Sequence, residues 1–265
     1  MSKIAKALEK AKAAQAGQGP AAREPQPAAS RAEVVQEESP APGYTCTRVL
    51  PVDQGHLESC RIRVAGEDIK TTDIFNLLRT QILQRTKDQG WNTLMVTSAR
   101  SREGKTTMSI NLAMSIARDM QQTAMLVETD LRKPDVSDYL GLNVDRGLSD
   151  YLIDDVPLSE LLINPGIDKL VVLPAGRALK GSTDLLGSPR MKQLVHELKQ
   201  RYPDRYVIFD SLPLLDMPDA LVFASYVDAI LMVVEAGKTT RRDISKALEM
   251  ISPGNLLGLV MNKAV

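Results

Sequence analysis

Residues able to bind a phosphate stand where a short apolar run gives way to a helical pattern. Leu94–Thr97 has the composition of a buried strand, and from Met108 onward apolar residues recur at helical spacing. The stretch between them, A-x-x-x-x-G-K-T, is one substitution from the G-x-x-x-x-G-K-[ST] pattern of a phosphate-binding loop. In such a loop Gly104 lets the backbone approach a phosphate, Lys105 places a cation on the β and γ oxygens, and the Thr106 hydroxyl binds Mg²⁺.

The predicted contacts to a nucleotide extend on both sides of these residues. They comprise Arg102, Glu103, Gly104, Lys105, Thr106, Thr107 and, at the end of the last predicted strand, Asn262. The N–H groups at the start of the helix point at the phosphate with the helix dipole behind them. An ordinary strand–turn–helix without a ligand is the competing interpretation of the loop.

Acidic residues follow two further apolar runs. Tyr206–Phe209 ends in Asp210, where a protein with a phosphate loop is expected to place the aspartate that holds Mg²⁺ directly or through water. Met125–Val127 is followed by Glu128 and, two residues later, by Asp130. We predict that one of these two carboxylates acts as a general base toward a hydroxyl and that the other holds metal or water. A solvated turn with acidic caps is the alternative for this pair.

The elements that must position these residues are a sheet and its covering helices. Strand-like runs are Leu94–Thr97, Ala124–Glu128, Leu170–Leu173, Tyr206–Asp210, Ala229–Val234 and Leu257–Val260. Helical patterns fall at Thr72–Thr86, Lys105–Met120, Ser188–Gln200 and Arg241–Ile251. This alternation predicts an α/β fold with a mostly parallel sheet flanked by helices on both faces. Ligands of such sheets bind beyond the carboxyl ends of the strands, where the loop and both acidic strand ends fall.

Composition divides the chain into three parts. Residues 1–16 favour helix strongly. Residues 17–43 are rich in Ala, Pro, Gln, Glu and Ser, which predicts a flexible, disordered tether. Residues 44–265 are predicted to form the phosphate-binding domain.

The composition also excludes several classes of function. The 265 residues carry 33 basic and 33 acidic side chains, and this balance gives no electrostatic case for binding nucleic acid. The two cysteines form no disulfide framework or metal-ligand pattern. The chain opens without the apolar segment of a signal peptide, and no apolar run is long enough to span a bilayer. We therefore predict a cytoplasmic protein.

Several motifs resemble those of the bacterial tyrosine kinases that serve exopolysaccharide and capsule export. Thr97–Thr107, Val127–Tyr139 with D-L-R-K-P, and Val207–Pro213 with D-S-L-P resemble their Walker A, Walker A′ and Walker B segments. Thr183–Met191 is similar to their E-L-L-S-P-M segment. The opening M-S-K-I-A-K-A-L-E-K and Leu57–Arg61 are most similar to the subgroup in exosortase-associated loci. The resemblance covers most of residues 45–265.

The resemblance implies a P-loop NTPase fold related to the MinD and ParA ATPases. It implies that Mg-ATP binds at Walker A and that tyrosines are phosphorylated, commonly on a neighbouring copy in a ring, so that the chain forms a homo-oligomer. It also implies activation by the cytoplasmic segment of a membrane protein that controls polysaccharide chain length, and recruitment to the inner face of the plasma membrane. The catalytic residues that it implies are Lys105, Glu128, Asp130 and Asp210, and the metal-binding residues are Thr106, Glu128 and Asp210.

The chain departs from the family pattern in four places. Glu128 replaces the usual first aspartate of Walker A′, which moves the carboxylate by one methylene. Ser101-Arg102 replaces the usual Pro-Gly. Asp73-x-x-Asn76-x-x-Arg79 stands where ring-forming members carry E-x-x-R-x-x-R, so one charge-assisted contact is lost. The end of the sequence carries no tyrosine cluster.

We therefore expect an ATP-dependent protein-tyrosine kinase that regulates exopolysaccharide biosynthesis and export. One alternative is a regulatory ATPase that switches assembly with a membrane partner and phosphorylates nothing. Another is a nucleotide-binding adaptor of the export complex. The absent tyrosine cluster and Glu128 favour the ATPase, whereas the retention of Lys105, Thr106 and Asp210 argues against a decayed site.

Overall fold

A computed structural model describes residues 47–63, 69–201 and 204–264. The predicted N-terminal helix over residues 1–16 and the predicted tether over 17–43 lie outside these ranges. None of the helices in the described ranges is both long and apolar enough to cross a bilayer.

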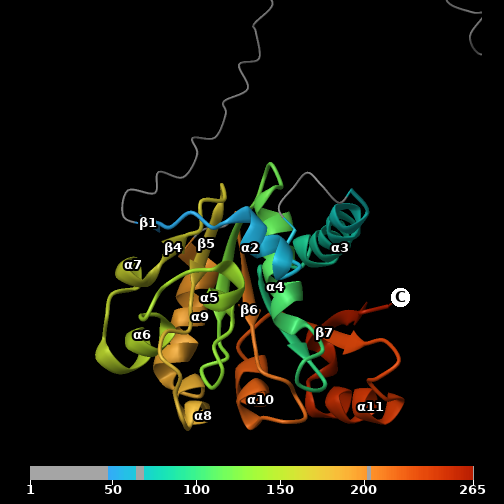
Figure 1. Ribbon diagram of the computed structural model, residues 1–265. Coiled ribbons are helices and arrows are strands. Elements are labelled where there is room, and N and C mark those ends of the chain that lie inside the picture. The colour runs from blue at the N-terminus through green and yellow to red at the C-terminus, as the bar shows by residue number, and fades with distance from the viewer. Residues whose placement is uncertain (1–46, 64–68, 202–203, 265) are drawn as a thin grey trace, which may run out of the picture. The chain divides into compact units, whose positions relative to one another are not determined.

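The described strands form one eight-stranded sheet in the order β1-β4-β5-β3-β6-β2-β7-β8 (Figure 1). Only β4 and β5 are antiparallel, and the other neighbouring pairs are parallel. The strands are β1 (Arg48–Val49), β2 (Thr93–Ser98), β3 (Thr123–Glu128), β4 (Ile163–Asn164), β5 (Leu170–Leu173), β6 (Arg205–Asp210), β7 (Ala229–Glu235) and β8 (Leu256–Asn262). The six predicted strands are confirmed to within two residues at each end. The two-residue strands β1 and β4 were not predicted.

The helices lie on both faces of the sheet, as predicted (Figure 1). The four predicted helices are confirmed as α3 (Ile69–Lys87), α4 (Lys105–Ala117), α9 (Pro189–Arg201) and α11 (Arg241–Met250). The further helices are α2 (Gln54–Ser59), α5 (Val136–Leu140), α6 (Leu148–Asp154), α7 (Leu158–Leu161), α8 (Ser182–Leu186) and α10 (Pro218–Ala224), with a 3₁₀ turn at Pro253–Asn255. The α/β fold prediction is therefore correct.

Alternate residues of the central strands enter two different cores. Along β6, Val207 and Phe209 pack with residues of α9 and α10, whereas Tyr206 and Ile208 pack with residues of α3 and α4. Asp210 continues the second series, because its carboxylate accepts a hydrogen bond from Ser109 on α4. The strand alternation therefore directs the Asp210 side chain to the face covered by α4.

Candidate nucleotide-binding and phosphoryl-transfer site

The carboxyl ends of β2, β3 and β6 meet at one edge of the sheet. Strand β6 lies between the other two, and Asp210 at its end pairs in register with Val96 of β2 and Glu128 of β3. The loops that follow these strands border a cavity of about 910 Å³. Of the predicted site residues, the cavity is lined by Arg102, Gly104, Lys105, Thr106, Thr107, Asp130 and Asn262.

Gly104 permits the close packing of the phosphate loop against β8. Its φ is 94°, in the left-handed region that favours glycine. A Cβ at this position would lie 2.1 Å from Nδ2 of Asn262, whose amide donates a 2.9 Å hydrogen bond to the Glu103 carbonyl. Asn262, predicted as a nucleotide contact, therefore fastens the loop to β8 and also lines the cavity.

Gly104→Ala is expected to destabilise the domain by about 3 kcal/mol or more, because backbone strain and a steric clash add together. Urea unfolding of the parent and the variant measures this difference. Gly237→Ala is the matched control, since Gly237 has a φ of 71° but nothing lies within 4 Å of an added Cβ. We expect the control to lose only about 1 kcal/mol. Equal losses in the two variants would contradict the clash with Asn262.

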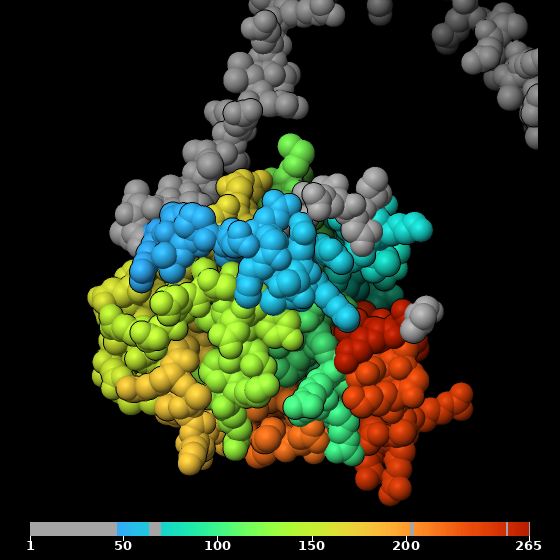
Figure 2. All heavy atoms as spheres, viewed as in Figure 1, coloured from blue at the N-terminus to red at the C-terminus, as the bar shows by residue number. Residues whose placement is uncertain are grey.

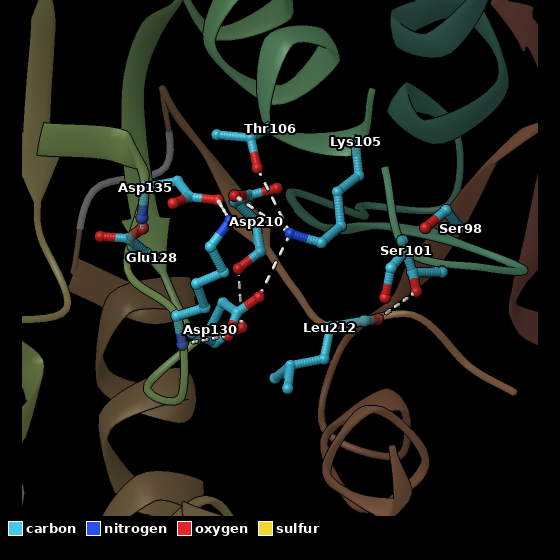
Figure 3. A network of polar contacts seen from close by, with 12 residues as sticks. Ser98, Ser101, Lys105, Thr106, Glu128, Asp130, Asp135, Asp210 and Leu212 are labelled. Carbon is cyan, nitrogen blue, oxygen red and sulfur yellow. Dashed lines mark hydrogen bonds and ion pairs between the residues drawn. The ribbon is translucent and has the colours of Figure 1, made fainter. Parts of the chain in front are cut away.

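The Lys105 ammonium lies between two carboxylates at the N-terminus of α4 (Figure 3). Its Nζ is 3.3 Å from Oδ2 of Asp130, 3.3 Å from the Thr106 hydroxyl and 4.0 Å from Oδ2 of Asp210. Burial disfavours the ammonium, but Asp210 and Asp130 outweigh it and raise the pKa of Lys105. The lysine is therefore charged and is positioned where a phosphate chain would meet the helix start.

Asp210 has the environment of a residue that holds a cation. Its side chain is fully buried, and its Oδ1 accepts a 2.9 Å hydrogen bond from the Ser109 hydroxyl. Its Oδ2 accepts no hydrogen bond from any residue that the structure describes. Burial raises the pKa of Asp210, and the Lys105 cation opposes that rise. A buried carboxylate oxygen that accepts no hydrogen bond within the described residues, with the Lys105 ammonium 4.0 Å away, fits the oxygen ligands that Mg²⁺ requires.

The two acidic residues near the end of β3 have different surroundings. Asp130 faces the cavity, where its Oδ2 accepts from Lys105 and its Oδ1 accepts a 3.0 Å hydrogen bond from the Lys133 N–H. Glu128 does not line the cavity. Its Oε1 accepts from the N–H groups of Asp135 at 2.6 Å and Val136 at 2.8 Å, and its Oε2 accepts from the Ala175 N–H at 3.0 Å. The Glu128 carboxylate thus ties the start of α5 to the end of β5.

The three backbone donors occupy both oxygens of a side chain that is only 1% exposed. Burial raises the pKa of Glu128 to about 7, although hydrogen bonds from these N–H groups favour the ionised form. Glu128 thus lies outside the cavity lining, and its role as a base or metal ligand stays a prediction.

Glu128→Gln is expected to destabilise the domain by about 2 kcal/mol, because the new amide would turn a donor toward a buried N–H group. The loss should shrink as the pH rises from about 4.5 to about 7, because the folded parent keeps its proton up to about pH 7 while the unfolded chain releases it near 4.5. Urea unfolding across this range tests both statements. We expect the variant to bind ATP with parental affinity. A large loss of ATP affinity would indicate that Glu128 binds the nucleotide or its metal.

Glu103 and Arg102 of the phosphate loop have different surroundings. The Glu103 carboxylate is buried and accepts hydrogen bonds from the Arg100 N–H at 3.0 Å and from the Thr239 hydroxyl, so this side chain fastens the loop, and contact of Glu103 with a nucleotide stays a prediction. Arg102 has a φ of 67° and lines the cavity. It stands where the family resemblance expects glycine and adopts the left-handed conformation that glycine adopts easily.

Sequence reasoning missed the contacts that hold the irregular part of the loop. The Ser101 N–H and hydroxyl donate to Oδ2 of Asp216 at 3.0 and 3.1 Å. The Arg100 guanidinium pairs with Asp216 at 3.0 Å and with Asp243 at 2.9 Å. These contacts join the phosphate loop to the segment after β6 and to the start of α11, and no motif in the sequence signals them.

The basic residues after Asp130 pair with more distant acids. The Arg132 Nη2 lies 3.0 Å from Oδ2 of the buried Asp219. Lys133 forms an exposed ion pair with Asp135 at 3.4 Å.

Comparisons with known proteins agree with this arrangement. A family model described as an AAA domain (AAA_31) matches residues 93–253. The tyrosine-protein kinase CpsD of Streptococcus pneumoniae serotype 4 is 34% identical over 200 residues, which cover 73% of this chain and 85% of CpsD. The succinoglycan biosynthesis transport protein ExoP of Rhizobium meliloti is 31% identical over 175 residues, covering 64% of this chain and 22% of ExoP.

The fold is also shared with a solved kinase domain. The kinase domain of the Escherichia coli tyrosine kinase ETK superposes with a TM-score of 0.68 at 25% identity, covering 82% of this chain and 91% of that domain. The match to the family model, over residues 93–253, includes the phosphate loop and both acidic strand ends of this chain. The chain therefore belongs to the bacterial tyrosine-protein kinase family of P-loop NTPases.

Proposed function

We propose that this protein is an ATP-dependent protein-tyrosine kinase that regulates exopolysaccharide biosynthesis and export. The observation that carries the proposal is the arrangement of Lys105, Asp130 and Asp210 around the start of α4, in a chain 34% identical to a tyrosine-protein kinase. The polysaccharide role is supported by the similarity to ExoP, a succinoglycan biosynthesis transport protein.

The residues of the site divide the chemistry as follows. Thr106 and Oδ2 of Asp210 would hold Mg²⁺, which would supply positive charge to the phosphate oxygens of ATP. Lys105 turns from Asp130 toward the same oxygens and stabilises the charge that they gain during transfer. The acceptor phenol oxygen attacks the γ phosphorus, the bond to the ADP oxygen breaks, and the phenol proton moves to the carboxylate that Lys105 has left, that of Asp130.

A regulatory ATPase is the second candidate, and the position of Glu128 favours it. With the Glu128 carboxylate bound to three backbone N–H groups, Asp130 is the one acid of the predicted pair that lines the cavity. A single carboxylate is enough to orient a water molecule for hydrolysis.

One experiment separates the two functions. The full chain is incubated with γ-labelled ATP and Mg²⁺, with and without the cytoplasmic peptide of a membrane co-polymerase from the same polysaccharide system, the partner that we propose brings the protein to the inner membrane face. Label on tyrosine supports the kinase. Release of phosphate without protein label supports the ATPase, and nucleotide-independent association with the peptide supports the adaptor.

A further inference from the structure

The segment Asp53–Arg63, here called the strap, is fastened beside the nucleotide cavity. Leu57 and Ile62 of the strap are 1% and 0% exposed. Asn111 on α4 holds its end, since the Asn111 amide donates to the Arg61 carbonyl at 3.2 Å and accepts from the Arg63 N–H at 2.8 Å. Figure 2 shows this blue segment on the outer surface, and its helix α2 contacts α5. The strap backbone therefore has a defined position next to α4.

Arg61 occupies a backbone position that normally belongs to glycine. After α2, the Ile62 N–H donates to the Leu57 carbonyl at 2.8 Å and the Arg61 N–H donates to the Glu58 carbonyl at 2.9 Å. This pair of hydrogen bonds defines a Schellman motif, in which the residue at the Arg61 position is left-handed and usually glycine. Arg61 has a φ of 61°. An arginine at this place is strained, and strain of this kind concentrates at ligand sites.

Arg61 lies at the cavity, and its guanidinium is available to bind an anion. Arg61 lines the nucleotide cavity, and its guanidinium forms no hydrogen bond or ion pair with any residue in the described ranges. Arg102, with a φ of 67°, shares both properties. Lys263, with a φ of 56°, also lines the cavity. Three of the five left-handed non-glycine residues among those described are thus basic residues of this one cavity.

We propose that Arg61 binds the phosphate chain of the nucleotide, as a cation that the strap brings to the P-loop from outside the Walker motifs. This inference rests on the proposed function, which names ATP as the ligand. Lys105 and Arg132 are already paired with carboxylates, whereas Arg61 and Arg102 line the cavity and their guanidinium groups have no partner among the described residues. Guanidinium donors match phosphate oxygens in a bidentate geometry.

Arg61→Gly separates binding from folding, because glycine suits the left-handed position. We expect the affinity for ATP to fall about 10-fold, the affinity for adenosine to stay unchanged, and the melting temperature to stay equal to or above that of the parent. Calorimetric titration and thermal unfolding of the full chain measure these quantities. Lys169→Gly is the matched control, since Lys169 is also a left-handed basic residue, with a φ of 59°, but does not line the cavity. Its affinity for ATP should equal that of the parent.

A second measurement uses Cys60, the neighbour of Arg61 on the cavity wall. In a Cys46→Ser variant, ATP should slow the alkylation of Cys60 by iodoacetamide, whereas adenosine should not. Parental ATP affinity in Arg61→Gly, or alkylation that ATP does not slow, overturns the role of Arg61. If the parent labels tyrosine but Arg61→Gly binds ATP with parental affinity, the kinase proposal stands and the role of Arg61 falls. If Arg61→Gly binds ATP more weakly but the parent labels no tyrosine, the role of Arg61 stands and the kinase proposal falls.

Discussion

Lys105→Met is expected to abolish phosphoryl transfer, with a loss of about 10³-fold or more in rate. Methionine retains most of the volume of the lysine side chain but removes the charge between Asp130 and Asp210. In the nucleotide complex the same charge would stabilise the oxygens of the transferring phosphoryl group, where a single cation is worth about 10³-fold. Transfer of labelled phosphate from γ-labelled ATP measures the effect. Lys238→Met is the control, because Lys238 is exposed and pairs with Glu235 away from the cavity.

The same substitution should make stability more dependent on pH. Without the lysine the burial of Asp210 is opposed only by hydrogen bonds, from groups such as the Ser109 hydroxyl, so the pKa of Asp210 rises further above that of the unfolded chain. A carboxyl group with a raised folded-state pKa stabilises the protein at low pH and loses that contribution as the pH rises through the folded value. Lys105→Met should therefore lose more stability at pH 8 than at pH 5 in urea unfolding. A variant that transfers phosphate at the parental rate would refute the assignment of the site.

The central sheet is predictable because its strands are continuous apolar runs. β2, β3 and β6 are buried along almost their whole length, so each reads as a single hydrophobic block bounded by polar residues. β1 and β4 contain two residues each, and their pairing depends on neighbours that local composition does not reveal. A strand this short leaves no periodic signal.

The positions of the two acidic residues near the end of β3 could not be distinguished from the sequence. Glu128 and Asp130 are two residues apart, and both were expected to reach the phosphate pocket. The Glu128 carboxylate instead meets the N–H groups of Val136 and Ala175, which lie 8 and 47 residues away in the chain. Such donors come from the packing of α5 and β5 against β3, so the difference between Glu128 and Asp130 is a tertiary effect.

A left-handed backbone position explains why Arg61 escaped prediction. A glycine at position 61 would have signalled a turn or a close backbone approach. Arg61 adopts a left-handed conformation without that signal, so its place on the cavity wall is visible only in the structure. The Lys105, Thr106 and Asp210 positions were predictable because their chemistry depends on local spacing along a strand and a helix start.

Asp210→Asn is expected to remove activity while leaving the nucleotide-free protein as stable as the parent or more stable. The Asn carbonyl still accepts the hydrogen bond from Ser109, so the packing of β6 against α4 is retained. An amide NH₂ group replaces Oδ2 of Asp210, and this group cannot hold Mg²⁺. The loss of phosphoryl transfer should reach about 10³-fold, and added Mg²⁺ should no longer strengthen the binding of ATP.

Stability should change in the opposite direction to activity, with a dependence on pH that follows from burial. Because burial raises the pKa of Asp210 in the folded state, the parent loses stability as the pH rises from the unfolded pKa through the folded one. The Asn variant has no such titration, so its advantage in urea unfolding should be larger at pH 8 than at pH 5. A structural carboxylate with no catalytic task would give the reverse result, a variant that is less stable and still active. The combination of higher stability with lost Mg²⁺-dependent binding would identify Asp210 as a residue kept for its chemistry at the expense of stability.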